Sequence, residues 1–161
     1  MRSVLVLISL LMALAGCDGA PEAGNRYQVS GQFSMGAGTR QFVATYLDST
    51  LIIVEERQRY GDLGAVQARY EVVDGHLVYY RCDESRQRRG SGASGHESVE
   101  LELAFDTAGT VLSQLKLVDG QPTSLQGYEA PGVQRHFEEL RRRAEEGREA
   151  ARASTSGPLP R

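Results

Sequence analysis

Short runs of alternating apolar and polar residues, separated by turn residues, limit the possible folds of this chain more than any other feature. The clearest runs extend from Val66 to Val73 and from His76 to Cys82, and they flank Asp74-Gly75. An Asp-Gly pair supplies the positive φ angles of a two-residue type I′ turn. The sequence therefore predicts a β-hairpin centred on Asp74-Gly75.

Pairing through that turn fixes the neighbours of each side chain. We expect Val72 opposite Leu77, Tyr70 opposite Tyr79, and Ala68 opposite Arg81. Aromatic cross-strand pairs stabilise a sheet, so the face that carries the two tyrosines is predicted to be buried. The predicted core of the hairpin is Tyr70, Val72, Leu77 and Tyr79.

The same alternation recurs on both sides of this hairpin, at residues 27–33, 42–46, 99–105 and 111–118, and the apolar start of residues 51–56 favours a strand covered on both faces. No helical pattern separates these runs, so parallel crossover connections are not expected. The fold class is predicted to be mainly β. We expect an antiparallel β-meander of about seven strands over residues 26–120, as an open sheet or a small barrel, followed by a C-terminal α-helix.

The helix is expected from Gln134 to about Arg152, within a linker and helix segment at residues 121–153. Apolar side chains form a narrow stripe there, with Glu–Arg pairs at i, i+4 on the other faces: Val133, Phe137, Leu140 and Ala144 in the stripe; Glu138–Arg142 and Glu139–Arg143 as the pairs. Because the stripe fades after Ala144, we expect only the first half of the helix to dock on the sheet. Residues 154–161 are expected to be disordered.

The amino terminus has the pattern of a targeting signal. Residues 1–16 combine a basic start at Arg2 with an apolar run too short to span a bilayer, which is typical of a secretory signal peptide. The junction Leu14-Ala15-Gly16-Cys17 resembles the lipobox of bacterial lipoproteins. That resemblance implies cleavage before Cys17, a diacylglyceryl thioether on its sulfur, and usually an acylated amino terminus, with palmitate-type chains as the membrane anchor.

The resemblance also implies a location. Residues 17–25 are small and polar and contain Pro and Gly, as expected of a lipidated tether. The protein is then a lipid-anchored component of the bacterial cell envelope that faces the periplasm. In enteric bacteria an aspartate after the lipidated cysteine resembles the signal for retention in the inner membrane, so Asp18 favours the inner membrane over the outer one.

Composition excludes few functions. A formal net charge of −3 gives no electrostatic reason to bind nucleic acid, which is not an expected partner. With Cys17 lipidated, Cys82 is the other of the two cysteines and has no partner for an intramolecular disulfide. We expect Cys82 to be a buried small apolar side chain, the alternative being a reactive thiol.

The segment 83–98 stands out because it joins three arginines, Arg86, Arg88 and Arg89, to a Gly- and Ser-rich stretch. A connection of this length is either functional or disordered. The three arginines are candidates for binding an anionic partner, such as an envelope protein or an anionic glycan or lipid, because guanidinium groups bind carboxylates and phosphates in a bidentate manner. The alternative is a solvated connector.

The sequence predicts neither a metal site nor a cofactor. His76, His96 and His136 have no ligand spacing, and a Ser94–His96–Asp83 triad lacks a strained nucleophile turn. Tyr80-Arg81-Cys82 together with Ser91-Gly92-Ala93 resembles pieces of the small lipoprotein lysozyme inhibitors, all-β barrels that insert a Ser-Gly loop into the lysozyme cleft. This chain departs from that family in having no second cysteine for the family's disulfide.

These observations favour a membrane-anchored binding or scaffolding module that is not an enzyme. The alternative is a periplasmic inhibitor that uses the arginine-containing segment 83–98, and a hydrolase comes last. The partner and the oligomeric state are left open by the sequence.

Overall fold

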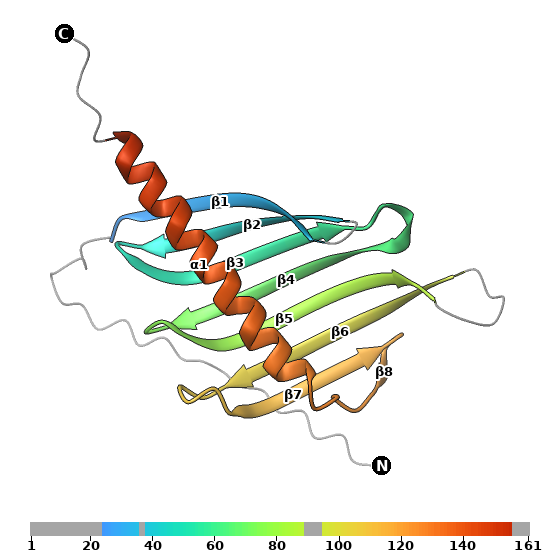
Figure 1. Cartoon of the computed structure of the whole chain (residues 1–161). Helices are drawn as coiled ribbons and strands as arrows, with labels where there is room; N and C mark the ends of the chain where they lie inside the picture. Colours follow the sequence, from blue (N-terminus) through green and yellow to red (C-terminus); the bar gives the residue numbers. More distant parts are fainter. Residues whose placement is uncertain (1–23, 36–37, 89–94, 156–161) are drawn as a thin grey trace, which may run out of the picture.

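Eight antiparallel strands follow one another in chain order in a single open sheet (Figure 1). The computed structural model describes residues 24–35, 38–88 and 95–155. The strands are β1 (Arg26–Met35), β2 (Gly38–Leu47), β3 (Thr50–Arg59), β4 (Gly64–Val73), β5 (His76–Gln87), β6 (His96–Phe105), β7 (Val111–Val118) and β8 (Gln121–Pro122). A short 3-10 helix, Gly61–Leu63, precedes β4, and the helix α1 (Glu129–Thr155) ends the described chain.

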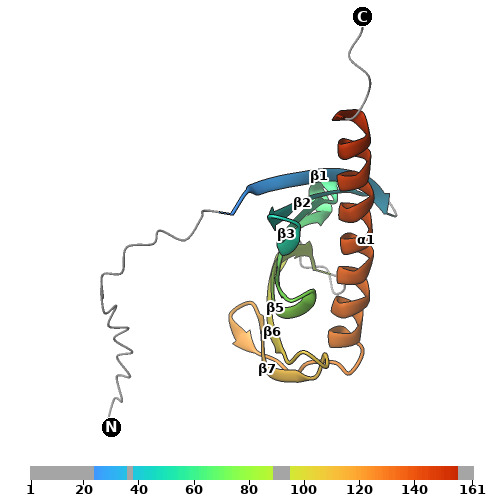
Figure 2. The same ribbon diagram turned by 90° about the vertical axis from the view of Figure 1, so that its left-hand side faces the viewer.

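The predicted fold class is confirmed, and the two alternatives are resolved in favour of the open sheet. The strand beyond the expected seven is β8, which pairs with the end of β7. Helix α1 crosses one face of the curved sheet diagonally, so the molecule has two layers (Figures 1 and 2). We call the face under α1 the concave face and the opposite one the convex face.

The hairpin at Asp74-Gly75 forms as predicted, with φ angles of 50° and 80° at its two turn residues. Its register agrees with the prediction only next to the turn, where Val72 lies opposite Leu77. Beyond that pair Tyr70 lies opposite Tyr80 rather than Tyr79, and Ala68 lies opposite Cys82 rather than Arg81. The prediction was wrong because an extra residue in β5, Val78, forms a β-bulge that reverses the faces of the residues after it.

Two further bulges occur in equivalent places. Ile52 and Leu112 are extra residues in β3 and β7, each just after a hairpin turn. The Ile52 bulge explains the apolar run Leu51–Val54: Leu51 and Val54 are buried, whereas Ile52 and Ile53 are half-buried, so β3 is not fully covered on both faces. All three bulges lie at the same end of the sheet, where they increase its twist and help to curve it around α1.

The core lies between the concave face and α1. Tyr70, Val72 and Leu77 belong to it, as predicted, whereas Tyr80 takes the place expected for Tyr79. The largest fully buried side chains come from both layers: Tyr46, Tyr70, Phe137, Leu103, Leu140 and Val54. Gly31 of β1 lets the ring of Phe42 lie close to the β1 backbone. A Cβ atom at position 31 would be only 2.4 Å from that ring.

Helix α1 buries three of the four residues of the predicted stripe, with Phe137, Leu140 and Ala144 at 1% exposure or less, and Val133 is half-buried against the core. It begins earlier and ends later than expected, at Glu129 and Thr155. The expectation that its second half is solvated was wrong in part. Gly147 lies against β1, because a Cβ atom at this position would be 2.9 Å from Val29 Cγ1. The helix therefore still contacts the sheet beyond the apolar stripe, at a residue that has no side chain.

Candidate functional site

The arginine-containing segment is more ordered than its composition suggested. Strand β5 continues to Gln87 and pairs with β6 from Tyr79↔Ala104 to Gln87↔His96. The expected loop 83–98 is therefore largely paired strand, and only residues 88–95 connect the two strands. The predicted loop was too long because the ends of β5 and β6 are rich in serine and charged residues, which resemble a loop in sequence. These side chains instead point alternately to the two faces of exposed strands.

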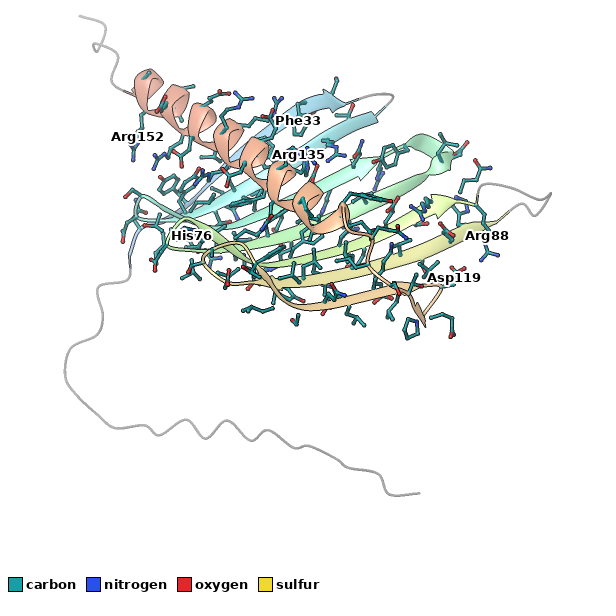
Figure 3. All side chains as sticks on the ribbon, turned by 60° about the horizontal axis from the view of Figure 1, so that its bottom comes forward. Phe33, His76, Arg88, Asp119, Arg135 and Arg152 are labelled. Atoms are coloured by element: carbon teal, nitrogen blue, oxygen red, sulfur yellow. The ribbon has the colours of Figure 1, made fainter. Side chains whose placement is uncertain are left out.

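Two of the three candidate arginines are paired with carboxylates. Arg86 forms an ion pair with Glu97, which lies opposite it on β6, and Arg88 forms one with Asp119. Figure 3 shows Arg88 and Asp119 close together at one end of the sheet, with His76 at the other end. Arg89 lies outside the described residues. An anionic partner would have to displace Glu97 or Asp119 to reach Arg86 or Arg88.

The other sequence candidates do not come together. Asp83 lies opposite Glu100, four residues along β6 from His96, a separation of about 13 Å in an extended strand. Ser94, Cys17 and the Ser91-Gly92-Ala93 stretch lie outside the described residues. Within residues 24–35, 38–88 and 95–155, no group of three or more His, Cys, Asp or Glu side chains has the arrangement to hold a metal ion.

Cys82 is buried, as expected, on the concave face of β5. Burial raises the pKa of its thiol to about 11, so the thiol is protonated at neutral pH. A protonated thiol is a poor nucleophile. The tyrosine of the Tyr80-Arg81-Cys82 stretch is buried beside it, so neither residue presents a surface to a partner.

Among the residues that the structure describes, the most enclosed charged group is the Glu56 carboxylate, which the sequence analysis did not single out. Glu56 is 2% exposed on the concave face of β3. Arg40 of β2 donates to one of its oxygens over 2.7 Å, and the Tyr70 hydroxyl donates to the other over 3.2 Å. His136 Nε2 of α1 lies 2.9 Å from that second oxygen and 2.7 Å from Arg40 Nη1.

The electrostatics of Glu56 follow from these contacts. Burial raises the pKa of its carboxyl group, but the hydrogen bond and charge of His136 and the Arg40 guanidinium outweigh burial and hold the pKa below its ordinary value. The charged carboxylate thus links α1 to β2, β3 and β4. We interpret this cluster as an attachment of the helix to the sheet. Its signal in the sequence is the acidic residue two positions after Val54, on the core-facing side of β3.

A second group of charges lies on the convex face, which no element of the described chain covers (Figure 2). Arg57, Arg69 and Arg81 belong to the adjacent strands β3, β4 and β5 and alternate with the core residues. Together with Glu55, Gln67 and Asp83 they line a hollow of about 170 Å³. We call Arg57, Arg69 and Arg81 the convex arginines.

The arrangement of the convex arginines is unusual in one respect. Arg69 and Arg81 lie directly opposite each other in the β4–β5 pair, a position where like charges destabilise a sheet. Arg69 is compensated by Glu55 and Glu71 at 3.3 and 2.9 Å, and Arg81 by Asp83 and Glu102 at 3.4 and 3.3 Å. Arg57 has no ion-pair partner among the described residues. Sequence reasoning missed these arginines because they are far apart in the chain.

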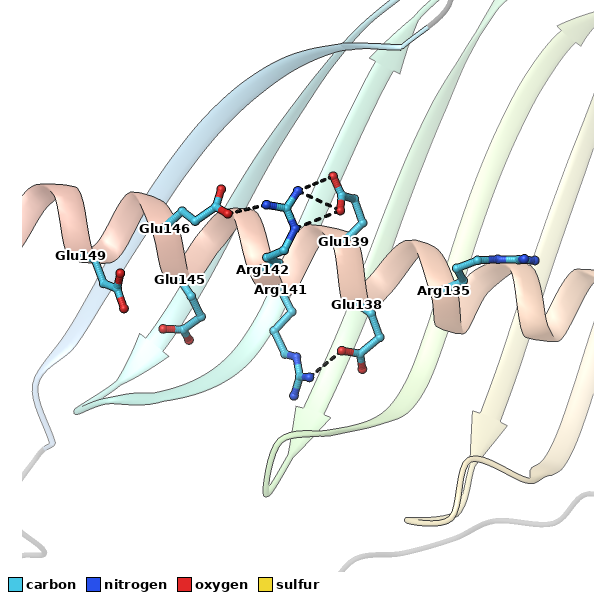
Figure 4. Close-up of a pocket in the computed structure, with 8 residues that line it drawn as sticks. All are labelled: Arg135, Glu138, Glu139, Arg141, Arg142, Glu145, Glu146 and Glu149. Atoms are coloured by element: carbon cyan, nitrogen blue, oxygen red, sulfur yellow. Dashed lines mark hydrogen bonds and ion pairs between the residues drawn. The ribbon is translucent and has the colours of Figure 1, made fainter.

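The outer face of α1 is the third charged surface. It carries Arg135, Glu138, Glu139, Arg141, Arg142, Glu145, Glu146 and Glu149 (Figure 4). The predicted Glu139–Arg143 pair forms at 2.7 Å, and Glu138 pairs with Arg141 instead of Arg142. Ion pairs within one exposed helix are common and weakly stabilising, so this face is typical of a solvated helix.

Over the described residues, no helix has the length and apolar character needed to cross a bilayer. Comparisons of the chain with protein-family models, with curated proteins and with solved structures find no match.

Proposed function

We propose that this chain is a lipid-anchored binding protein of the bacterial cell envelope that recognises an anionic partner through the convex arginines. The observation that carries the proposal is the register pair Arg69↔Arg81, with Arg57 beside it on an uncovered face. A partner carboxylate or phosphate would meet Arg57, which has no ion-pair partner among the described residues, and would compete with the exposed carboxylates that compensate Arg69 and Arg81. Functional sites are where a sequence most often departs from rules of local stability.

Arginine is suited to such a role because its planar guanidinium forms two parallel hydrogen bonds with a carboxylate or phosphate. The convex arginines also differ from Arg86 and Arg88 in position. They project from the middle of paired strands, which hold them at fixed spacing, whereas Arg86 is the second-last residue of β5 and Arg88 follows its end. A rigid element positions binding groups more accurately than a connection does.

The lipid anchor enters the proposal through the lipobox. Lipidation at Cys17 and the tether at residues 17–25 would hold β1, and with it the whole sheet, near the membrane surface facing the periplasm. In enteric bacteria Asp18 would favour the inner membrane. The alternative of a periplasmic inhibitor uses the segment 83–98, in which Arg86 and Arg88 are paired with carboxylates, whereas Arg89 and Ser91-Gly92-Ala93 lie outside the described residues.

The test places a photoreactive amino acid at Gln67, an exposed residue between the convex arginines, in the full chain expressed in living cells. We expect one discrete adduct on irradiation. The double variant Arg57→Gln/Arg81→Gln should lose most of that adduct, because an exposed electrostatic site depends on its charges. A second arm measures sedimentation with phosphatidylglycerol vesicles and separates a lipid partner from a protein partner.

The matched control is Arg135→Gln/Arg142→Gln, which removes two exposed arginines from the outer face of α1 and should leave the adduct unchanged. Binding should weaken as salt rises, because exposed charges are screened over about 8 Å at physiological ionic strength. Absence of both an adduct and vesicle binding, or equal effects of the two double variants, would overturn the proposal.

A further inference from the structure

The outer edge of β1 is an open hydrogen-bonding edge. Strand β1 is the first in the strand order, and no described strand pairs with its outer side. The Asp48 amide donates to the Asn25 carbonyl over 2.8 Å, next to the pair Arg26↔Leu47. Peptide groups alternate between the two sides of an antiparallel strand. Odd-numbered residues of β1 therefore bond to β2, and the even-numbered residues from Arg26 to Ser34 direct their N–H and C=O groups outward.

This edge lacks the usual protection. Natural sheets guard their edges with short strands, lysine, proline or a bulge. Strand β1 has ten residues, Arg26 as its single charged residue, no proline, and an unbroken register with β2. The opposite edge differs, because β8 covers the end of β7 and itself contains Pro122.

Helix α1 extends beyond this edge. Gly147 lies against Val29 of β1, and the helix continues for eight more residues to Thr155, about 12 Å of helix. Figure 2 shows the end of α1 running past β1 on the concave side. Strands lie about 4.8 Å apart, so one or two additional strands would fit beneath the end of the helix. A second copy of the chain would bring its own α1 into the same space.

We infer that the outer edge of β1 binds an extended segment of a partner protein as an added antiparallel strand. Backbone hydrogen bonds supply the affinity in this mode of recognition, and alternate side chains supply the specificity. Tyr27, Val29 and Phe33 lie on the concave side of β1, whereas its convex side carries Arg26 and four neutral polar residues. The segment that fits has apolar side chains under α1 alternating with mainly neutral polar ones.

A peptide with the sequence of β1 itself meets these requirements and serves as the probe. Pairing about Ser30 places Tyr27 opposite Phe33 and Gln28 opposite Gln32, with apolar residues on the concave side and no like charges opposite each other. A single strand avoids the overlap of two α1 helices. The inference concerns a different surface from the convex arginines, so either proposal stands or fails without the other.

The experiment measures binding of the fluorescent peptide 26–35 to the purified full chain by anisotropy. The substitution Ser30→Pro removes an outward N–H that the described chain does not use, and an edge strand tolerates proline there. We expect Ser30→Pro to weaken binding about tenfold, from the lost hydrogen bond and altered edge geometry, and the control Ser30→Thr to change it less than about twofold. Circular dichroism and melting temperature verify the fold of both variants.

A second comparison leaves the protein unchanged and so does not depend on the folding of a variant. A peptide N-methylated at its Ser30 position should lose binding, because that N–H faces β1 in the expected register. A peptide N-methylated at its Val29 position should bind as well as the unmodified one. Failure of the unmodified peptide to bind at millimolar concentration, equal binding to wild type and Ser30→Pro, or equal loss with both methylated peptides would overturn the inference.

Discussion

At the scale of single residues, Glu56 shows how one buried charge is made tolerable. Removing a carboxylate from water is costly unless hydrogen bonds and opposite charges replace the water. Arg40, Tyr70 and His136 supply these contacts from three different elements. Because each partner comes from a different part of the chain, the cluster exists only when α1 is docked on the sheet, and it couples helix docking to the charge of Glu56.

The predicted consequence is acid sensitivity. A carboxyl group with a lowered native pKa stabilises the fold above its ordinary value of 4.5, and this contribution is lost as pH falls through the lower native value. We expect Glu56→Gln to lower the free energy of unfolding by about 1–3 kcal/mol at pH 7. The difference from wild type should shrink below about pH 4.5. Urea denaturation at pH 7 and at acidic pH measures it.

The control for this prediction is Glu138→Gln, which neutralises an exposed carboxylate on the outer face of α1. Its effect should stay within about 0.5 kcal/mol at neutral pH, as for most surface substitutions. A destabilisation by Glu56→Gln that is the same at neutral and acidic pH would contradict the assignment of the lowered pKa.

At the scale of elements, the packing of α1 requires a glycine at position 147 but not at position 132. Gly147 allows the helix to approach β1, because a Cβ atom there would lie 2.9 Å from Val29 Cγ1. Gly132, in the first turns of the same helix, has no atom within 4 Å of the position of a Cβ atom. The two glycines therefore differ in packing, although both reduce intrinsic helix propensity.

One substitution at these two positions should have opposite effects. Gly132→Ala is expected to raise the free energy of unfolding by about 0.5–1 kcal/mol, through reduced entropy of the unfolded chain and better helix propensity. Gly147→Ala should lower it by about 1–3 kcal/mol, because the added methyl group forces α1 away from β1. Thermal and urea denaturation measure the free energy of unfolding of the two variants. Stabilisation by both would show that the helix does not pack closely at Gly147.

At the scale of the whole molecule, the two proposed binding surfaces lie on a domain that the proposed lipidation of Cys17 would attach to the membrane at one end. With Cys17 lipidated, the tether at residues 17–25 joins the anchor to β1 and has a reach of at most about 30 Å. The domain would therefore work close to the bilayer surface. One acyl chain holds a protein only reversibly, whereas two or three hold it firmly.

The anchor is tested by Cys17→Ser. We expect the wild-type protein extracted from membranes to begin at Cys17 and to carry the mass of the diacylglyceryl group and the amino-terminal acyl chain. The variant should accumulate as uncleaved precursor or be released from the membrane. Intact-mass spectrometry and membrane fractionation measure both. A mature terminus elsewhere, or a chain without acyl mass, would exclude the lipoprotein assignment.

The sequence by itself determined the local structure and left the candidate site undecided. Alternation and turn residues specified the meander and the Asp74-Gly75 hairpin, because side-chain periodicity and positive φ angles are local properties. The apolar stripe specified which face of α1 is buried. The mature terminus and the lipid anchor are also sequence-level predictions, which no described residue tests.

Only the tertiary structure decided what depends on residues distant in the chain. The Val78 bulge moved Tyr80 into the core in place of Tyr79, and no local signal distinguishes one extra residue in a strand from regular alternation. The open sheet, the Glu56 cluster, the Arg69↔Arg81 pair and the edge of β1 with which no described strand pairs all arise from strand order and register. Register is set by the packing of the whole sheet against α1, and therefore is a property of the complete fold rather than of any segment.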